Sequence, residues 1–281
     1  MPAVILSSGL RVHCEIADTT DPWRTAETML LHHGLGKTGR YWLPWSRVLS
    51  RYFRVVTIDM LGNGLSSRPR GHRWSIAGYA RDAVEVLDAL GLRKVHFVGE
   101  GLGGCVGLQL GARHGARVAS LTLCATPYRP SEGASADLAA RSQAIARGGL
   151  ADFVDTTLPS RMDWSRFPKA AYAWYREQRL RTSPRIMSEQ MAAQDGVDLE
   201  WALPLIAAPT LLIVPGDSPS GADLQMKTMS RAIRGARIAA FPHERQWVTF
   251  SAADDCVAAT LRFLADVTGD RTLAADRVSR A

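Results

Sequence analysis

Residues 95–104 read VHFVGEGLGG, and this stretch decides the fold that we expect. Its first four residues form a short run rich in β-branched and aromatic side chains, which predicts a buried strand. The glycine-rich turn leads into a helix in which Gly103, Gly107 and Gly111 recur every four positions. That spacing leaves a bare stripe along one helix face, so the helix can approach a sheet closely. A strand, a tight turn and a close-packed helix therefore follow one another.

Similar apolar runs recur on both sides of this unit, with helical patterns between them. Residues 76–90 carry apolar side chains at helical spacing and are followed by Gly91, a typical residue after a helix C-terminus. The alternation predicts an α/β fold with a central, mostly parallel sheet flanked by helices. We expect its strands at Met29–Leu31, Arg54–Ile58, Val95–Val98, Leu121–Cys124, Thr210–Val214 and Ile238–Phe241.

The strand rhythm stops between residues 129 and 205, where the chain becomes helical and rich in aromatic and methionine side chains. This segment is predicted to be a helical cap inserted into the sheet domain. Residues 1–128 and 206–281 would then form the core domain. Within the second part, residues 252–267 are expected to form a closing helix, followed by a polar tail from Gly269. Most of the cap aromatics are expected to pack as core, and a few to face a cavity beneath them.

Composition narrows the possible partners of the chain. The 281 residues are 46% hydrophobic and carry a formal net charge of +7, but the basic residues are scattered and form no nucleic-acid-binding motif. We therefore expect a small-molecule ligand and no nucleic acid, and the sequence leaves the oligomeric state open. No apolar run approaches the roughly 20 residues needed to cross a bilayer, so no membrane partner is expected. Four isolated cysteines fit a reducing compartment and a cytoplasmic location.

Three glycine-containing motifs follow one another along the chain. The first is His33–Gly36 (HGLG), the second is Asp59–Ser66 (DMLGNGLS), and the third is Gly99–Gly104 (GEGLGG), each after an expected strand. Over roughly residues 5–268 the chain resembles the α/β-hydrolase superfamily, which places an oxyanion loop, a D-x-x-G-x-G-x-S turn and a G-x-S-x-G nucleophile elbow at these points. The resemblance implies the α/β-hydrolase fold.

Later segments extend the resemblance. Residues 209–214 (PTLLIV) look like the strand before the family's acid-bearing loop, and residues 242–248 (PHERQWV) look like its histidine loop. The run from Gly111–His114 into Leu121–Cys124 is similar to small-molecule esterases and lactonases of the enol-lactonase branch.

All three positions of the family's catalytic triad are replaced. Gly101 stands where the nucleophile belongs, and a hydrogen atom cannot attack a carbonyl. Gln246 stands at the histidine position, and an amide has no protonation equilibrium near neutral pH. Ser218 stands at the acid position, although a shift of one place would make Asp217 the acid. Changes in three separate loops favour a protein that does not use the triad over a single engineered replacement.

The backbone of the implied oxyanion hole survives these replacements. In the family its N–H donors come from the residue after the elbow and from the oxyanion loop, here Leu102 and Leu35. We expect a ligand to contact the following residues: Leu35, Trp42, Gly101, Leu102, Gln246 and Trp247.

Four residues are candidate bases in place of the missing histidine: His243, Glu100, Glu244 and Asp217. Glu100 has an alternative role as a structural hydrogen-bond acceptor, and His33 is expected to fix its loop. His243 and Asp217 could act together in displaced positions, but neither side chain would supply a nucleophile.

No metal and no cofactor is expected. The sequence lacks an H-E-x-x-H pattern, and residues 99–104 lack the spacing of a dinucleotide loop. The sequence predicts a protein that acts on or binds a small ester- or lactone-like carbonyl compound through non-covalent oxyanion-hole chemistry, such as hydrolysis by water, isomerisation, cyclisation or a lyase reaction. The alternative is a catalytically inactive pseudo-hydrolase that serves as a small-molecule binder or accessory protein.

Overall fold

The computed structural model describes residues 3–130, 134–218 and 221–275. Its central feature is an eight-stranded sheet in the order β1-β2-β4-β3-β5-β6-β7-β8. Strands β1 and β2 pair antiparallel, as do β2 and β4, and the other neighbours are parallel. The strands are β1 (Ala3–Ile5), β2 (Arg11–Ala17), β3 (Thr28–His32), β4 (Arg54–Asp59), β5 (Val95–Glu100), β6 (Val118–Cys124), β7 (Thr210–Asp217) and β8 (Arg237–Arg245).

The predicted α/β fold with a mostly parallel sheet is confirmed, and each of the six expected strands lies within an observed one. The antiparallel strands β1 and β2 were not predicted. Strand β2 alternates apolar residues with His13 and Glu15, and it lies near the sheet edge, where polar side chains are tolerated. Its sequence therefore lacks the continuous apolar run that marks a strand buried on both faces.

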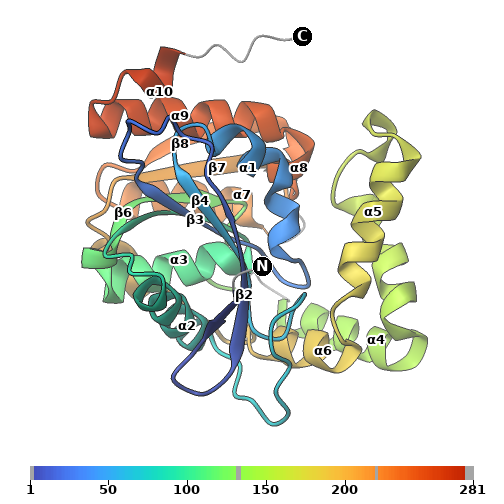
Figure 1. The fold of residues 1–281 in the computed structure, drawn as a ribbon. Helices are drawn as coiled ribbons and strands as arrows, with labels where there is room; N and C mark the ends of the chain where they lie inside the picture. The colour runs from blue at the N-terminus through green and yellow to red at the C-terminus, as the bar shows by residue number, and fades with distance from the viewer. Residues whose placement is uncertain (1–2, 131–133, 219–220, 276–281) are drawn as a thin grey trace.

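Helices cover both faces of the sheet because successive strand side chains point to opposite sides. In β3, Leu30 packs into the core under α2 (Ile76–Ala89), α3 (Leu102–Arg113) and α7 (Ala222–Ala232). Its neighbours Met29 and Leu31 pack into the core under α1 (Leu43–Leu49) and α9 (Ala253–Thr268). Figure 1 shows these two helical layers on either side of the strands. The short helices α8 (Val248–Ser251) and α10 (Thr272–Ala275) complete the C-terminal part.

The glycine stripe of α3 faces the sheet, as predicted. A Cβ atom added to Gly103 would lie 2.3 Å from the His32 carbonyl oxygen, and one added to Gly107 would lie 2.8 Å from the Phe97 ring. Larger side chains would therefore push α3 away from β3 and β5. This close packing fixes the N-terminus of α3 against the end of β5.

Between β6 and β7, the regular elements of the described residues are all helical: α4 (Ala134–Thr157), α5 (Lys169–Leu180) and α6 (Pro184–Ala192), with short 3-10 helices between α4 and α5 and after α6. They stand to one side of the sheet in Figure 1. Their own apolar cluster includes Phe153, Tyr175 and Met187, and it is joined by Tyr41 and Trp247 from the sheet domain. The proposed division at residues 129 and 205 stays a prediction.

None of the described helices combines the length and the apolar character needed to cross a bilayer. All four cysteines are buried and unbridged, as expected for small hydrophobic core residues.

Candidate active site

The turn between β5 and α3 keeps the sharp geometry of a nucleophile elbow. Gly101 has φ 53° and ψ −115°, a conformation that L side chains rarely adopt. Its N–H donates to the Cys124 carbonyl at 3.0 Å, and its carbonyl accepts from the Cys105 N–H at 3.0 Å. A Cβ atom at Gly101 would meet nothing within 4 Å. The elbow therefore presents backbone to open space.

The loop after β3 is tied to the end of β4 by His33. This ring bonds the Gly34 carbonyl through Nδ1 at 2.7 Å, and its Nε2 accepts from the Met60 N–H at 3.0 Å. Burial lowers the pKa of His33 to about 4, so the ring is neutral at pH 7 and suited to accept that bond. Its position fits the predicted loop-fixing role.

The Asp59 carboxylate holds the neighbouring turn. It accepts from the Gly39 N–H at 2.6 Å and from the Leu65 N–H at 2.8 Å. The Ser66 hydroxyl donates to the Asp59 carbonyl at 2.5 Å. The D-x-x-G-x-G-x-S motif thus supports the loops around the elbow.

A cavity of about 190 Å³ opens over the elbow. Leu102 is the first residue of α3, and the first N–H groups of a helix have no partner within the helix. These groups carry the positive end of the helix dipole and favour negative charge nearby. Six residues nominated from the sequence line the cavity: Leu35, Glu100, Gly101, Leu102, Gln246 and Trp247. That any of them contacts a ligand stays a prediction.

Three of the candidate bases lie elsewhere. His243 is exposed near the end of β8, and Asp217 is exposed at the end of β7. Glu244 is held by Arg166 at 2.6 Å and by the Ser251 hydroxyl at 2.5 Å. None of the three is among the described residues that line the cavity. The pairing of β7 with β8 shifts register between Pro215 and Asp217, and the regular burial pattern is lost there, which the motif spacing did not reveal.

The other two nominated residues also lie outside the cavity lining. Ser218 is buried beyond the end of β7. Trp42, which we expected at the ligand, is only 1% exposed and packs edge-on against Trp45 with ring centroids 5.1 Å apart. Its ring belongs to the core under α1 and α9 rather than to the cavity.

The strongest electrostatic feature of the cavity is an ion pair between Lys37 and Glu100. The Lys37 Nζ donates to both carboxylate oxygens, at 2.5 and 2.7 Å, and the two side chains are only 3% and 6% exposed. Burial lowers the pKa of Lys37 from 10.5 to about 8, and Glu100 opposes that shift. Glu100 is therefore neutralised by a lysine from the oxyanion loop.

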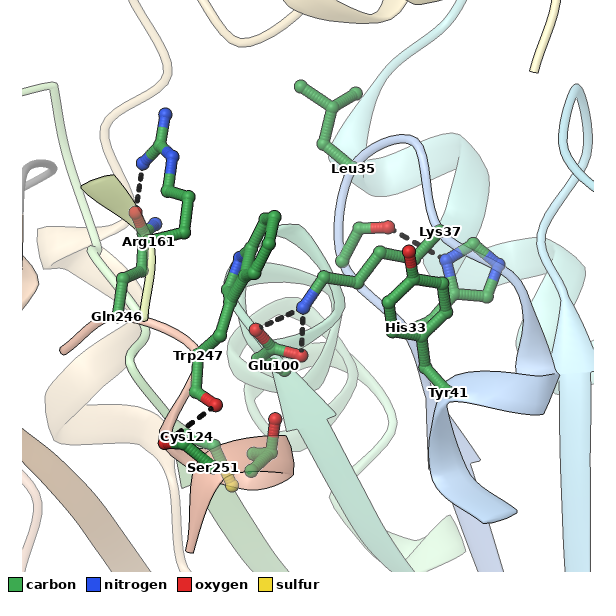
Figure 2. A network of polar contacts seen from close by, with 12 residues as sticks. His33, Leu35, Lys37, Tyr41, Glu100, Cys124, Arg161, Gln246, Trp247 and Ser251 are labelled. Carbon is green, nitrogen blue, oxygen red and sulfur yellow. Dashed lines mark hydrogen bonds and ion pairs between the residues drawn. The ribbon is translucent and has the colours of Figure 1, made fainter. Parts of the chain in front are cut away.

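Aromatic rings surround the ammonium group of Lys37. Its Nζ lies 4.8 Å from the Trp247 ring centroid, 5.1 Å from that of Tyr41 and 5.9 Å from that of Tyr175. Figure 2 shows the ammonium between the rings of Trp247 and Tyr41, above the Glu100 carboxylate. Such rings attract a cation through their quadrupoles, so they also favour the charged lysine.

Two arginines from the cap reach the same cavity. Arg179, from α5, donates from Nη1 to the Leu35 carbonyl at 2.7 Å, and its guanidinium lies 5.7 Å from the Trp247 ring centroid. Arg161 donates to the Gln246 side-chain oxygen, as Figure 2 shows. The amide at the histidine position is therefore engaged by a cation, an arrangement that a histidine ring could not accept in its charged form.

Sequence reasoning missed Lys37, Arg161 and Arg179. One signal was present: Lys37 immediately follows the HGLG motif and is one of only four lysines. The arginines gave no signal, because they lie in a cap without recognisable motifs. The combined site offers hydrogen-bond donors, cations and one buried lysine–glutamate ion pair, and the elbow residue Gly101 carries no hydroxyl or thiol.

The comparisons with known proteins agree with this architecture. Residues 27–252 match the family model for the alpha/beta hydrolase fold. A Stutzerimonas stutzeri protein named "Putative carbamate hydrolase RutD" is 31% identical over an alignment covering 73% of this chain and 78% of its own. A Caulobacter vibrioides protein of the same name is 43% identical, but that alignment covers 37% of this chain and 39% of the relative.

Solved structures show the same fold. The enol-lactonase from Burkholderia xenovorans LB400 has a TM-score of 0.86 and 25% identity, with 94% of this chain and 99% of that chain covered. A hydrolase from Pseudomonas aeruginosa PA01 has a TM-score of 0.85 and 24% identity, with 94% and 97% covered. The chain belongs to the α/β-hydrolase fold family.

Proposed function

We propose that this protein acts on a small ester-, lactone- or carbamate-like carbonyl compound without forming an acyl-enzyme. The observation that carries the proposal is Gly101, which keeps the elbow backbone but gives it no side chain. The RutD relatives bear the name of a carbamate hydrolase, and the Burkholderia xenovorans protein that of an enol-lactonase. These names support the choice of substrate class.

Hydrolysis would then proceed by direct attack of water. The N–H groups of Leu35 and Leu102 donate hydrogen bonds to the carbonyl oxygen as it becomes negative, which is the main stabilisation available. The attacking water loses a proton to Glu100, and Lys37 gives a proton to the leaving oxygen or nitrogen. Transfer of the proton from Glu100 to Lys37 restores the ion pair, so protons balance over the cycle.

The pair suits this role because of where it lies and how it titrates. Both side chains line the cavity beside Gly101, and a lysine with a pKa of about 8 can give and take protons near neutral pH. The same pair would move a proton in an isomerisation or lyase reaction through an enolate. Gln246 and Trp247 would orient the ligand.

The first experiment follows hydrolysis of p-nitrophenyl acetate together with the intact mass of the protein. We expect linear release of p-nitrophenol from the start and no acetyl adduct at any side chain. Lys37→Met and Glu100→Gln should each lower turnover at least tenfold, the lower range for general acid–base catalysis. His243→Ala, on an exposed residue outside the cavity lining, is the matched control and should leave turnover unchanged. A pre-steady-state burst with a covalent acetyl adduct would disprove the proposal.

A second candidate function is a non-catalytic binder, and one observation favours it. Both oxygens of Glu100 are occupied by Lys37, so the base is engaged before any water arrives. A mass-spectrometric time course with lactones, esters and carbamates separates the two functions. Product above the buffer background supports the enzyme, whereas a ligand that stays bound and chemically unchanged supports the binder.

A further inference from the structure

We infer that the ligand of this cavity carries a carboxylate, held by Arg179 together with Arg161. This inference rests on the proposed function and adds the charge of the substrate. Among the described residues that line the cavity, five are basic and one is acidic: Lys37, Arg129, Arg141, Arg161, Arg179 and Glu100. A site for a neutral ester needs no such excess of positive charge.

Part of this charge is already balanced inside the protein. Glu100 neutralises Lys37, and Arg129 forms an exposed ion pair with Glu200 at 3.2 Å. The argument therefore depends on Arg179, which is only 7% exposed and still lines the cavity. A guanidinium stays charged at all ordinary pH values, so its burial calls for anionic or carbonyl partners.

Arg179 has one such partner and lacks another. Its Nη1 donates to the Leu35 carbonyl at 2.7 Å, whereas its buried Nε has no hydrogen-bond partner among the described residues. An unpaired buried donor on a charged group is costly, and a carboxylate is the acceptor that fits a guanidinium fork with two parallel bonds. A ligand carboxylate would thus complete a partly satisfied site.

The position of Arg179 is fixed before the ligand arrives. Its guanidinium lies 5.7 Å from the Trp247 ring centroid, and its bond to Leu35 links α5 of the cap to the oxyanion loop. The N-terminus of α3, at Leu102, adds a positive dipole end that also lines the cavity. A carboxylate at Arg179 would leave the ligand's carbonyl group within the same cavity as Gly101.

The test compares two probes of nearly equal shape, 4-oxopentanoate and its neutral amide, 4-oxopentanamide. Both carry a ketone that cannot be hydrolysed, and only the first carries a charge. Isothermal titration of the full chain should show at least tenfold tighter binding of 4-oxopentanoate. In Arg179→Gln, the affinities for the two probes should differ by no more than about twofold. Its affinity for 4-oxopentanamide should be unchanged, which also shows that the variant is folded.

Two further variants sharpen the result. Arg161→Gln removes the second cation and should reduce the preference several-fold. Arg176→Gln is the matched control, because Arg176 lies on the same helix but pairs with Asp155 at the surface, and it should leave both affinities unchanged. Equal binding of the two probes by the unaltered protein, or binding of neither, would overturn the inference. An acetyl adduct in the earlier experiment would instead disprove the proposed function, and the charge preference could still be measured.

Discussion

Breaking the Lys37–Glu100 ion pair from either side should destabilise the fold strongly, whereas removing both charges should not. The two side chains are nearly inaccessible, with Nζ 2.5 and 2.7 Å from the carboxylate oxygens. In Lys37→Met, Glu100 is left buried without a cation and can become neutral by taking up a proton. Protonating an ordinary glutamate at pH 7 costs about 3.7 kcal/mol. In Glu100→Met, Lys37 can lose its proton at a cost of about 4.6 kcal/mol.

These values agree with the roughly 3–5 kcal/mol lost when one partner of a buried pair is removed. The double variant Lys37→Met/Glu100→Met leaves no buried charge, so its loss should be no larger than that of either single variant. The free energy of unfolding from urea titrations, followed by tryptophan fluorescence and circular dichroism, measures all three. The matched control Arg176→Gln breaks an exposed pair and should leave the free energy of unfolding almost unchanged. Strict additivity in the double variant would refute the reasoning.

Three more predictions concern backbone strain and protonation. Gly101→Ala should lower the free energy of unfolding by about 1–2 kcal/mol, because alanine is strained at φ 53° even with open space around its Cβ. The control Gly115→Ala, at a glycine with equal space but without a positive φ, should not lower it. Equal urea midpoints for the two variants would contradict this prediction. Burial lowers the pKa of His32 to about 3 and that of His33 to about 4, so the unfolded chain binds more protons below pH 6.5. The free energy of unfolding should therefore fall as the pH is lowered from 6.5 towards 4, with a slope of at most about 2.7 kcal/mol per pH unit. An absence of proton uptake on unfolding at pH 5 would argue against this prediction. Burial lowers the pKa of Lys37 from 10.5 to about 8, so the unfolded chain binds more protons between these two pH values. The difference in free energy of unfolding between the unaltered protein and Lys37→Met should therefore rise with pH from 8 to 10.5. A flat or falling difference in urea titrations would count against this prediction.

The sheet could be predicted from the sequence where its strands are buried on both faces. Strands such as β7 read as continuous apolar runs, because parallel strands covered by helices have no polar side. The antiparallel strand β2 was missed, since its His13 and Glu15 interrupt that signal. Motif order placed Gly101 and Gln246, because loops after parallel strands meet at one edge of the sheet.

The remainder of the site depends on contacts between distant residues. Lys37 and Glu100 are 63 positions apart, and Arg179 is 144 positions from the Leu35 carbonyl that it binds. No local pattern encodes such distances. Three of the candidate bases were chosen by their nearness in sequence to the missing histidine and acid, but His243 lies where the pairing of β7 and β8 shifts register, and its side chain is exposed. Tertiary packing therefore decides which titratable groups reach the cavity.

The charges around the elbow explain why one restored side chain should not restore a serine hydrolase. A serine at position 101 needs a neutral base that can accept its proton, yet Gln246 cannot take a proton and is already bound by Arg161. Glu100, which stays paired with Lys37, is the base proposed for a mobile water molecule and not for a side chain fixed at the elbow. The cations around the elbow nevertheless favour negative charge on a bound ligand. Gly101→Ser should therefore bind 4-oxopentanoate but give no burst with p-nitrophenyl acetate, and a burst from this single variant would show that a base can activate a hydroxyl at the elbow after all.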